Sequence, residues 1–157
     1  MSQVVIVTGG AGGIGSAICT GLVSDGHRVV IADFDGTAAE RLSKDLGSGS
    51  LAVQVDVSNK KSVEDMISEA RSRFGNIDVL LNGAGIMPRH QVKDIAEDEW
   101  DRVLGINLKG VFLCSQAVSG QMVERKQGRI LSIASGRGVA GAAGAAHYAA
   151  SKAGVIA

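Results

Sequence analysis

Short apolar runs alternate along this chain with longer segments in which apolar residues recur every three or four positions. Five runs are typical of parallel strands covered on both faces: residues 4–7, 28–33, 51–55, 77–81 and 129–134. The helical patterns between and after them cover residues 13–25, 36–46, 58–74, 97–125 and 147 onward. This alternation predicts an α/β fold of the doubly wound, Rossmann type, with three layers (αβα) around one parallel sheet.

Two of the helical segments carry apolar stripes that predict which face is buried. The helix at 58–74, with Ser58 as its expected cap, has the stripe Val63, Met66, Ile67, Ala70 and Phe74. The helix at 97–125 has the stripe Trp100, Val103, Leu104, Val111 and Phe112. Asn107 lies on this second stripe, where an unpaired buried amide would cost about 1–3 kcal/mol. It is therefore either a satisfied structural residue or part of a polar network in a cleft.

The composition indicates one domain over residues 1–157. Sixteen basic and sixteen acidic residues cancel without any charge block, which argues against nucleic acid or an anionic membrane surface as a partner. We expect no membrane helix, because no apolar run approaches about 18 residues. Cys19 and Cys114 lie in helical segments and indicate buried thiols in a reducing, cytoplasmic compartment. No metal site is predicted.

The segment between the first strand and the first helix is rich in glycine. Residues 8–15 are Thr-Gly-Gly-Ala-Gly-Gly-Ile-Gly, so free backbone N–H groups and the helix N-terminus can bind a pyrophosphate there. Two registers fit a dinucleotide fingerprint: Gly10, Gly12 and Gly15, or Gly9, Gly13 and Gly15, with Ile14 inside both. The alternative is a tight turn without a ligand, but a strand before, a helix after and an acid further on favour a nucleotide.

That acid is Asp33, at the end of the second strand. A carboxylate there accepts hydrogen bonds from the adenosine ribose and repels a 2′-phosphate, which favours NAD over NADP. Asp56, followed by Val57, can reach the adenine amino group, although an aspartate before a helix is also a common cap. The Asn-Gly-Ala-Gly turn at 82–85 is either an ordinary turn or a place where a cofactor approaches the backbone.

Near the end of the sequence, Tyr148 and Lys152 are four residues apart in a helical segment and so share a face. A free phenol titrates near ~10, and bringing it to neutral pH takes about 4 kcal/mol. A charge about 4 Å away supplies up to ~4 kcal/mol at an effective dielectric constant of ~20, but only ~1 kcal/mol in water. The pair therefore works only inside a cleft. On an exposed helix the two would be unrelated polar residues.

These residues together resemble the short-chain dehydrogenase/reductase family of the classical type. The matching positions are Thr8, Gly9, Gly13, Gly15, Asp33, Asp56, Asn82, Ala84, Gly85, Asn107, Ser135, Tyr148 and Lys152. Ser135 precedes Tyr148 by 13 positions, which is the spacing of the family's Ser–Tyr pair. The resemblance implies that Tyr148 is the general acid/base and that Lys152 lowers its pKa and holds the nicotinamide ribose. It also implies that Ser135 orients the substrate oxygen and that Asn107 supports a water relay to Lys152.

The sequence departs from the family pattern in two respects. Gly83 stands where the family usually has a second asparagine, and we expect the turn to form with one hydrogen bond fewer. Family members also continue further, with the rest of the last helix, two more strands and a substrate lid. The resemblance thus implies a domain truncated after the fifth strand and the start of the following helix. A chain ending at Ala157, with an open strand edge at 129–134, is expected to be poorly soluble and inactive.

The function predicted from the sequence is NAD(H)-dependent interconversion of a secondary alcohol and a ketone by hydride transfer. One alternative is a non-catalytic nucleotide-binding fragment, and another is an NADP-dependent 3-oxoacyl reductase, which Asp33 disfavours. The expected partner is a small-molecule alcohol or ketone, and the resemblance implies a homo-oligomer. Arg89, His90 and Arg137 lie near positions that should face a polar or anionic substrate, but solvated surface is the favoured explanation for each of them.

Overall fold

A computed structural model describes residues 2–157. All five strands pair in parallel in one sheet, in the order β3-β2-β1-β4-β5. Their bounds are β1 Val4–Thr8, β2 Arg28–Asp33, β3 Ser50–Gln54, β4 Val79–Asn82 and β5 Arg129–Ser132. The predicted doubly wound sheet is confirmed, and the connection from β3 to β4 returns the chain to the other side of β1. The loops after β1 and β4 therefore diverge at the carboxyl edge, where this fold binds ligands.

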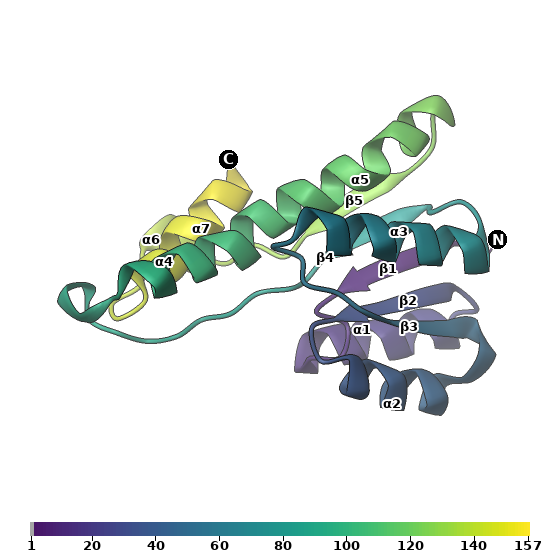
Figure 1. The fold of residues 1–157 in the computed structure, drawn as a ribbon, viewed down its shortest axis with the longest axis horizontal. Helices are drawn as coiled ribbons and strands as arrows, with labels where there is room; N and C mark the ends of the chain where they lie inside the picture. The colour runs from purple at the N-terminus through teal and green to yellow at the C-terminus, as the bar shows by residue number, and fades with distance from the viewer. Residues whose placement is uncertain (1) are drawn as a thin grey trace.

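Helices cover both faces of the sheet, which gives the predicted three layers (Figure 1). On one face, α1 (Gly13–Ser24) and α2 (Gly36–Leu46) pack on the side chains of Val5, Val7, Val29 and Ile31. On the other face, α3 (Lys60–Phe74) and α5 (Gly110–Glu124) pack on Ile6, Val30 and Leu80. The two sets alternate along each strand, as side chains of a strand must, so these apolar runs are buried on both sides.

The remaining elements extend away from the sheet as an arm in Figure 1. They are η2 (Val92–Asp94), α4 (Glu97–Leu104), α6 (Arg137–Ala140) and α7 (Ala146–Ile156), while η1 (Gly47–Gly49) links α2 to β3. The predicted helix at 97–125 has nearly the right limits, but it is not a regular α-helix over its whole length. A π turn, η3 (Gly105–Lys109), joins α4 to α5, and the Gly110 N–H donates to the Gly105 carbonyl, five residues back.

The structure corrects several local predictions. Asn59, rather than Ser58, caps α3, because its side chain accepts from the Ser62 N–H at 3.1 Å. The side chains of Trp100 and Phe112 are 40% and 58% exposed, so they do not belong to the buried stripe. The π turn shifts the helix phase and so explains the exposure of Phe112, which follows it. The buried face of α5 is instead Leu113, Cys114, Val118 and Met122. Four strands, all except β2, also begin or end one to two residues from their predicted limits.

The continuous helix Glu97–Glu124 is long and apolar enough to cross a membrane by length and composition alone, contrary to the expectation from the sequence. In the structure it carries part of the core, with Cys114 and Val118 fully buried beside the sheet. A core helix has the same composition as a membrane span, so this feature carries no argument for membrane insertion.

An ion pair and its hydrogen bonds at the amino edge of the sheet connect β1, β4 and the end of α5. The Asp78 carboxylate accepts from Arg125 Nη2 at 2.7 Å and from the Val4 N–H at 3.0 Å, while Arg125 Nη1 donates to the Ile77 carbonyl at 3.1 Å. Desolvation alone would raise the pKa of Asp78, but the hydrogen bonds from Arg125 and Val4 outweigh it and lower that pKa below its usual value.

We expect Asp78→Asn to reduce the free energy of unfolding by about 1–3 kcal/mol at neutral pH, since it weakens the charge-assisted hydrogen bond between Asp78 and Arg125. A lowered folded-state pKa contributes stability that is present above the unfolded value, near ~3.9, and is lost as pH falls through the folded value. The difference between the variant and the wild type in urea titrations should therefore shrink as the pH falls below ~3.9 through the lowered folded-state pKa. Asp65→Asn, which removes an exposed partner of Lys61, is the control and should change stability by under ~0.5 kcal/mol. A difference that persists at low pH would contradict the role assigned to the carboxylate.

Candidate cofactor and catalytic site

The glycine loop after β1 is shaped by close backbone approaches. Gly9 has φ +68°, and a Cβ there would meet the Ala84 Cα at 2.9 Å. A Cβ on Gly15 would lie 2.1 Å from the Gly9 carbonyl oxygen. By contrast, a Cβ on Gly13 would meet nothing within 4 Å. Gly9 and Gly15 are thus required by the fold, whereas Gly13 leaves open space at the start of α1.

The N-terminus of α1 carries the features of a phosphate site. Its N-cap is Gly12, which supplies no side-chain cap, so the first-turn N–H groups have no side-chain acceptor. No acidic residue lies in this first turn, and the open position at Gly13 adjoins it. The helix dipole and the free N–H groups favour an anion here, as the glycine pattern predicts.

Asp33 occupies the end of β2 and faces the glycine loop. Its carboxylate accepts from the Ala11 N–H at 2.9 Å and from the Asp35 N–H at 3.0 Å. Two carboxylate oxygens have about four acceptor sites, so capacity remains for ribose hydroxyls. Asp35 instead caps α2 by accepting from the Ala38 N–H at 2.9 Å. Of these two acids, Asp33 alone lines the large cleft.

We expect Asp33→Ala to raise kcat/KM with NADP relative to kcat/KM with NAD. A carboxylate at this position disfavours a 2′-phosphate, and the variant removes it. Asp35→Ala is the matched control, because it removes a neighbouring negative charge that caps a helix. An unchanged ratio in Asp33→Ala would show that the specificity is set elsewhere.

Asp56 and Val57 follow β3 and line the same cleft. The Asp56 Oδ1 atom accepts from the Ser58 N–H at 2.9 Å and from the Ser58 hydroxyl at 2.7 Å. The aspartate thus holds a turn and is not the cap of α3, so that alternative from the sequence is wrong. Val57 also packs tightly on the long helix, since a Cβ on Gly110 would lie 2.8 Å from Val57 Cγ2.

The segment after β4 lies directly beside the glycine loop, but residues 83–85 form no regular turn, contrary to the expectation from the sequence. The Thr8 hydroxyl accepts from the N–H groups of Gly83 and Ala84, at 3.1 and 3.3 Å. The buried Asn82 amide donates to the hydroxyls of Ser115 and Ser132, both at 3.3 Å. Its Oδ1 atom has no hydrogen-bond partner within residues 2–157.

Asn107 lies fully buried in the π turn and meets this loop from the other side. Its Oδ1 accepts from the Ile86 N–H and its Nδ2 donates to the Ile86 carbonyl, both at 2.9 Å. Nδ2 also donates to the Ser151 hydroxyl on α7 at 3.1 Å. A Cβ on Gly85 would lie 3.3 Å from Asn107 Oδ1 and 3.8 Å from Lys152 Nζ. Asn107 is therefore both a satisfied buried amide and part of a polar network that reaches α7.

Lys152 is 5% exposed and projects from α7 toward the carboxyl edge of the sheet. Its ammonium group donates to the Ile133 carbonyl at 2.6 Å and lies 5.9 Å from the centre of the Tyr148 ring. Burial lowers the pKa of Lys152, because desolvation penalises the charged form. Lys152 is thus buried, as the sequence argument required of the pair, whereas Tyr148 is half-buried.

Ser135 lies in the turn that leads into α6, where its hydroxyl accepts from the Arg137 N–H at 3.2 Å. No hydrogen bond joins Ser135 to Tyr148 in the part of the chain that the structure describes. The structure thus places Lys152 beside Tyr148, and Asn107 beside both α7 and Gly85. Ser135 remains separate from them in its hydrogen bonding.

A cleft of about 1030 Å³ runs along the carboxyl edge of the sheet. Its lining combines the glycine loop, Asp33, the turn after β3, the segment Gly83–Ile86 after β4 and one face of the α4–η3 helix. Lys152 adjoins it through Gly85, which belongs to the lining. The volume suits a dinucleotide better than a small metabolite.

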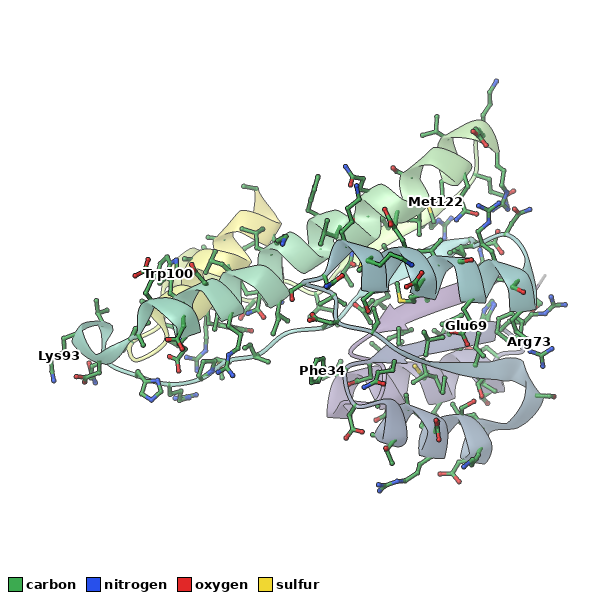
Figure 2. The ribbon with its side chains drawn as sticks, in the orientation of Figure 1. Phe34, Glu69, Arg73, Lys93, Trp100 and Met122 are labelled. Atoms are coloured by element: carbon green, nitrogen blue, oxygen red, sulfur yellow. The ribbon has the colours of Figure 1, made fainter. Side chains whose placement is uncertain are left out.

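Several residues of the site were missed in the sequence. Figure 2 shows Phe34 projecting from the end of β2, where its ring is 73% exposed and lines the cleft. An aromatic residue directly after the ribose-binding acid is a signal that could have been recognised. Ser151 was also missed, because its hydrogen bond to Asn107 joins residues 44 positions apart. Thr8 was recognised in the glycine motif, but its hydrogen bond to the Gly83 N–H, 75 positions away, was not predicted.

The strand order, the glycine loop and the acid after β2 define a dinucleotide-binding α/β domain. The chain belongs to the short-chain dehydrogenase family, whose sequence profile matches residues 3–157. This confirms the resemblance inferred from the motifs.

Relatives with known names agree with this assignment. The chain is 38% identical over 158 residues to (2S)-((R)-hydroxy(phenyl)methyl)succinyl-CoA dehydrogenase subunit BbsD of Thauera aromatica, covering 99% of this chain and 63% of that one. It is 40% identical over 159 residues to a 3-oxoacyl-(acyl-carrier-protein) reductase of Synechocystis, covering 99% and 64%. The chain thus spans less than two thirds of the length of these relatives.

A solved structure shows the same fold. The 3-ketoacyl-(acyl-carrier-protein) reductase of Brucella melitensis, crystallised with NADH, superimposes with a TM-score of 0.91 at 29% identity. The match covers 98% of this chain and 66% of that protein.

Proposed function

We propose that this chain forms the cofactor-binding and proton-transfer part of an oxidoreductase that interconverts a secondary alcohol and a ketone. The observation that carries the proposal is the buried Lys152 ammonium, which lies over the Tyr148 ring and beside Gly85 at the margin of the cleft. A nicotinamide cofactor, when bound, supplies the acceptor or donor of the hydride. Family membership and the reductases among the relatives support this activity class.

In this proposal Tyr148 holds and moves the proton. During alcohol oxidation its deprotonated oxygen takes the hydroxyl proton of the substrate, and during ketone reduction the phenol gives the proton back. Lys152 favours the anionic oxygen by its charge and uses its remaining donors to hold the ribose. Ser135 orients the substrate oxygen. Asn107 positions the backbone of Ile86 and, through Ser151, α7.

For the cofactor we propose NAD(H). The open glycine loop, the uncapped N-terminus of α1 and the spare acceptor sites of Asp33 fit a dinucleotide with two free ribose hydroxyls. The residue after Asp33 is Phe34, which offers no charge to a 2′-phosphate and can cover the adenine or its ribose with an apolar ring. The Brucella melitensis reductase was crystallised with NADH, which is consistent with this choice.

A second candidate concerns the substrate, namely a 3-oxoacyl thioester and its 3-hydroxy counterpart. Its support comes from the names of the relatives, which include several 3-oxoacyl-(acyl-carrier-protein) reductases and an enzyme of a CoA ester. This reaction is one instance of the ketone–alcohol chemistry proposed above, so it needs no change in the roles of Tyr148 and Lys152. The NADP dependence considered with this alternative remains disfavoured by Asp33.

The test is turnover by the complete natural protein, followed at the absorbance of the reduced cofactor. NAD with a panel of simple secondary alcohols and 3-hydroxyacyl thioesters should give NADH, and the reverse reaction should consume it. Turnover restricted to thioesters would select the second candidate. NADH binding without turnover of any substrate in either direction would contradict the enzymatic proposal and favour a non-catalytic nucleotide-binding protein.

A further inference from the structure

Three chain segments meet at a single carboxylate oxygen outside the cleft. Glu99 Oε1, on the first turn of α4, lies 2.8 Å from His90 Nδ1 and 3.0 Å from His147 Nε2. His90 belongs to the loop between β4 and α4, and His147 is the second residue of α7. We refer to these three side chains as the Glu99 clasp.

Two of the three side chains in the Glu99 clasp, those of His147 and Glu99, are largely buried, whereas the third is at the surface. The His147 side chain is fully buried and that of Glu99 is only 16% exposed, whereas that of His90 is half exposed. The hydrogen bond from His90, and next the one from His147, lower the pKa of Glu99 against the desolvation that opposes them. An ionised Glu99 only accepts hydrogen bonds, so both imidazoles donate an N–H to it.

The first turn of α7, which contains His147, has no side-chain cap of its own. The N-cap of α7 is Ala145, which provides no side-chain cap, and alanine is among the poorest caps. The first hydrogen bond within this helix joins the Ala149 N–H to the Ala145 carbonyl at 3.0 Å. Tyr148 lies within this uncapped first turn, directly after His147, and α4 packs along α7 (Figure 1).

We propose that Glu99 is a positioning residue, which fixes the first turn of α7 through His147 and thereby sets the place of the Tyr148 hydroxyl. This inference rests on the proposed function of Tyr148. Displacement of a reacting group by about 1 Å can cost a hundredfold in rate, so a turn free to fray would be costly. The His90 imidazole attaches the loop after β4 to the same carboxylate oxygen. The backbone N–H of His90 also donates to the Gly144 carbonyl at 2.9 Å.

The experiment compares Glu99→Ala and His147→Phe in the complete natural protein. Each should lower kcat about tenfold or more, because a hydrogen bond to a charged acceptor is lost in both. The dissociation constant of NADH should stay within about twofold, since the clasp lies outside the cofactor cleft. The double variant should be no slower than the slower single variant, because both act through one bond. His147→Gln, which keeps an N–H donor, should restore most of the rate.

A control and a second readout separate this role from general destabilisation. His27→Phe removes another histidine hydrogen bond, in which Nδ1 accepts from the Gln3 N–H at 3.1 Å, at the opposite edge of the sheet. It should leave kcat unchanged. Hydrogen exchange of the Ala149 amide should be about tenfold faster in both clasp variants and unchanged in His27→Phe.

The outcomes distinguish the two proposals. An unchanged kcat in Glu99→Ala, unchanged exchange at Ala149, or multiplicative losses in the double variant would each overturn the positioning role. If the wild-type protein turns over no substrate, the proposed function fails, and exchange at Ala149 still decides whether Glu99 holds this turn.

Discussion

Tyr148→Phe should lower kcat by at least about a hundredfold while leaving NADH affinity nearly intact. Only the hydroxyl carries the proton, and general acid/base catalysis is worth about 10²–10⁴-fold. The ring itself remains, so its position 5.9 Å from the Lys152 ammonium is preserved. The measurement is steady-state kinetics in both directions, together with NADH binding followed by fluorescence.

The variant is informative because it removes a single atom in a half-buried position. Retention of more than about a tenth of kcat would contradict the proton-transfer role of Tyr148. A comparable loss of NADH affinity would instead point to a change in the shape of the cleft.

Lys152→Ala should impair both chemistry and cofactor binding, because one ammonium group serves both. We expect kcat to fall by about a hundredfold or more and the KM for NAD to rise. The Ile133 carbonyl also loses its donor at 2.6 Å, so the variant should be less stable by about 1–3 kcal/mol. Lys152→Met keeps most of the buried stem and should show the same kinetic losses with a smaller loss of stability.

The pH dependence of the wild type follows from the same residue. Burial lowers the pKa of Lys152, so raising the pH removes its charge sooner than it would for an exposed lysine. We therefore expect kcat to decline at alkaline pH, and this decline should be absent from the residual activity of Lys152→Met. An identical alkaline limb in both proteins would assign it to another group.

Most of the fold could be predicted because parallel strands covered on both faces produce continuous apolar runs. The runs that contain Val5, Val29 and Leu80 are of this kind. The exposure of Phe112 could not be predicted, because it depends on the π turn at Gly105–Lys109, which lies three to seven residues earlier in the chain. An extra residue in a helical turn leaves the apolar composition unchanged and alters only the phase.

The candidate site likewise contains residues that the sequence could predict and contacts that it could not. The glycine loop, Asp33 and the Tyr148–Lys152 pair follow local patterns, so their places at the sheet edge could be inferred from strand order. The Glu99–His147 hydrogen bond joins residues 48 positions apart, and no spacing rule indicates it. The Ser58 cap was wrong for a related reason, since Asp56 binds the Ser58 hydroxyl and leaves Asn59 to cap the helix.

The π turn at Gly105–Lys109 has a consequence for insertions and deletions. Each helical residue turns the chain by about 100°, so removing one residue from this turn would rotate α5 by that angle relative to α4. The buried side chains of Leu113 and Val118 would then leave the sheet, and the Asn107 amide would no longer meet Ile86. Single substitutions along the exposed side of this helix should be tolerated, whereas any change in its length between Val103 and Leu113 should prevent folding.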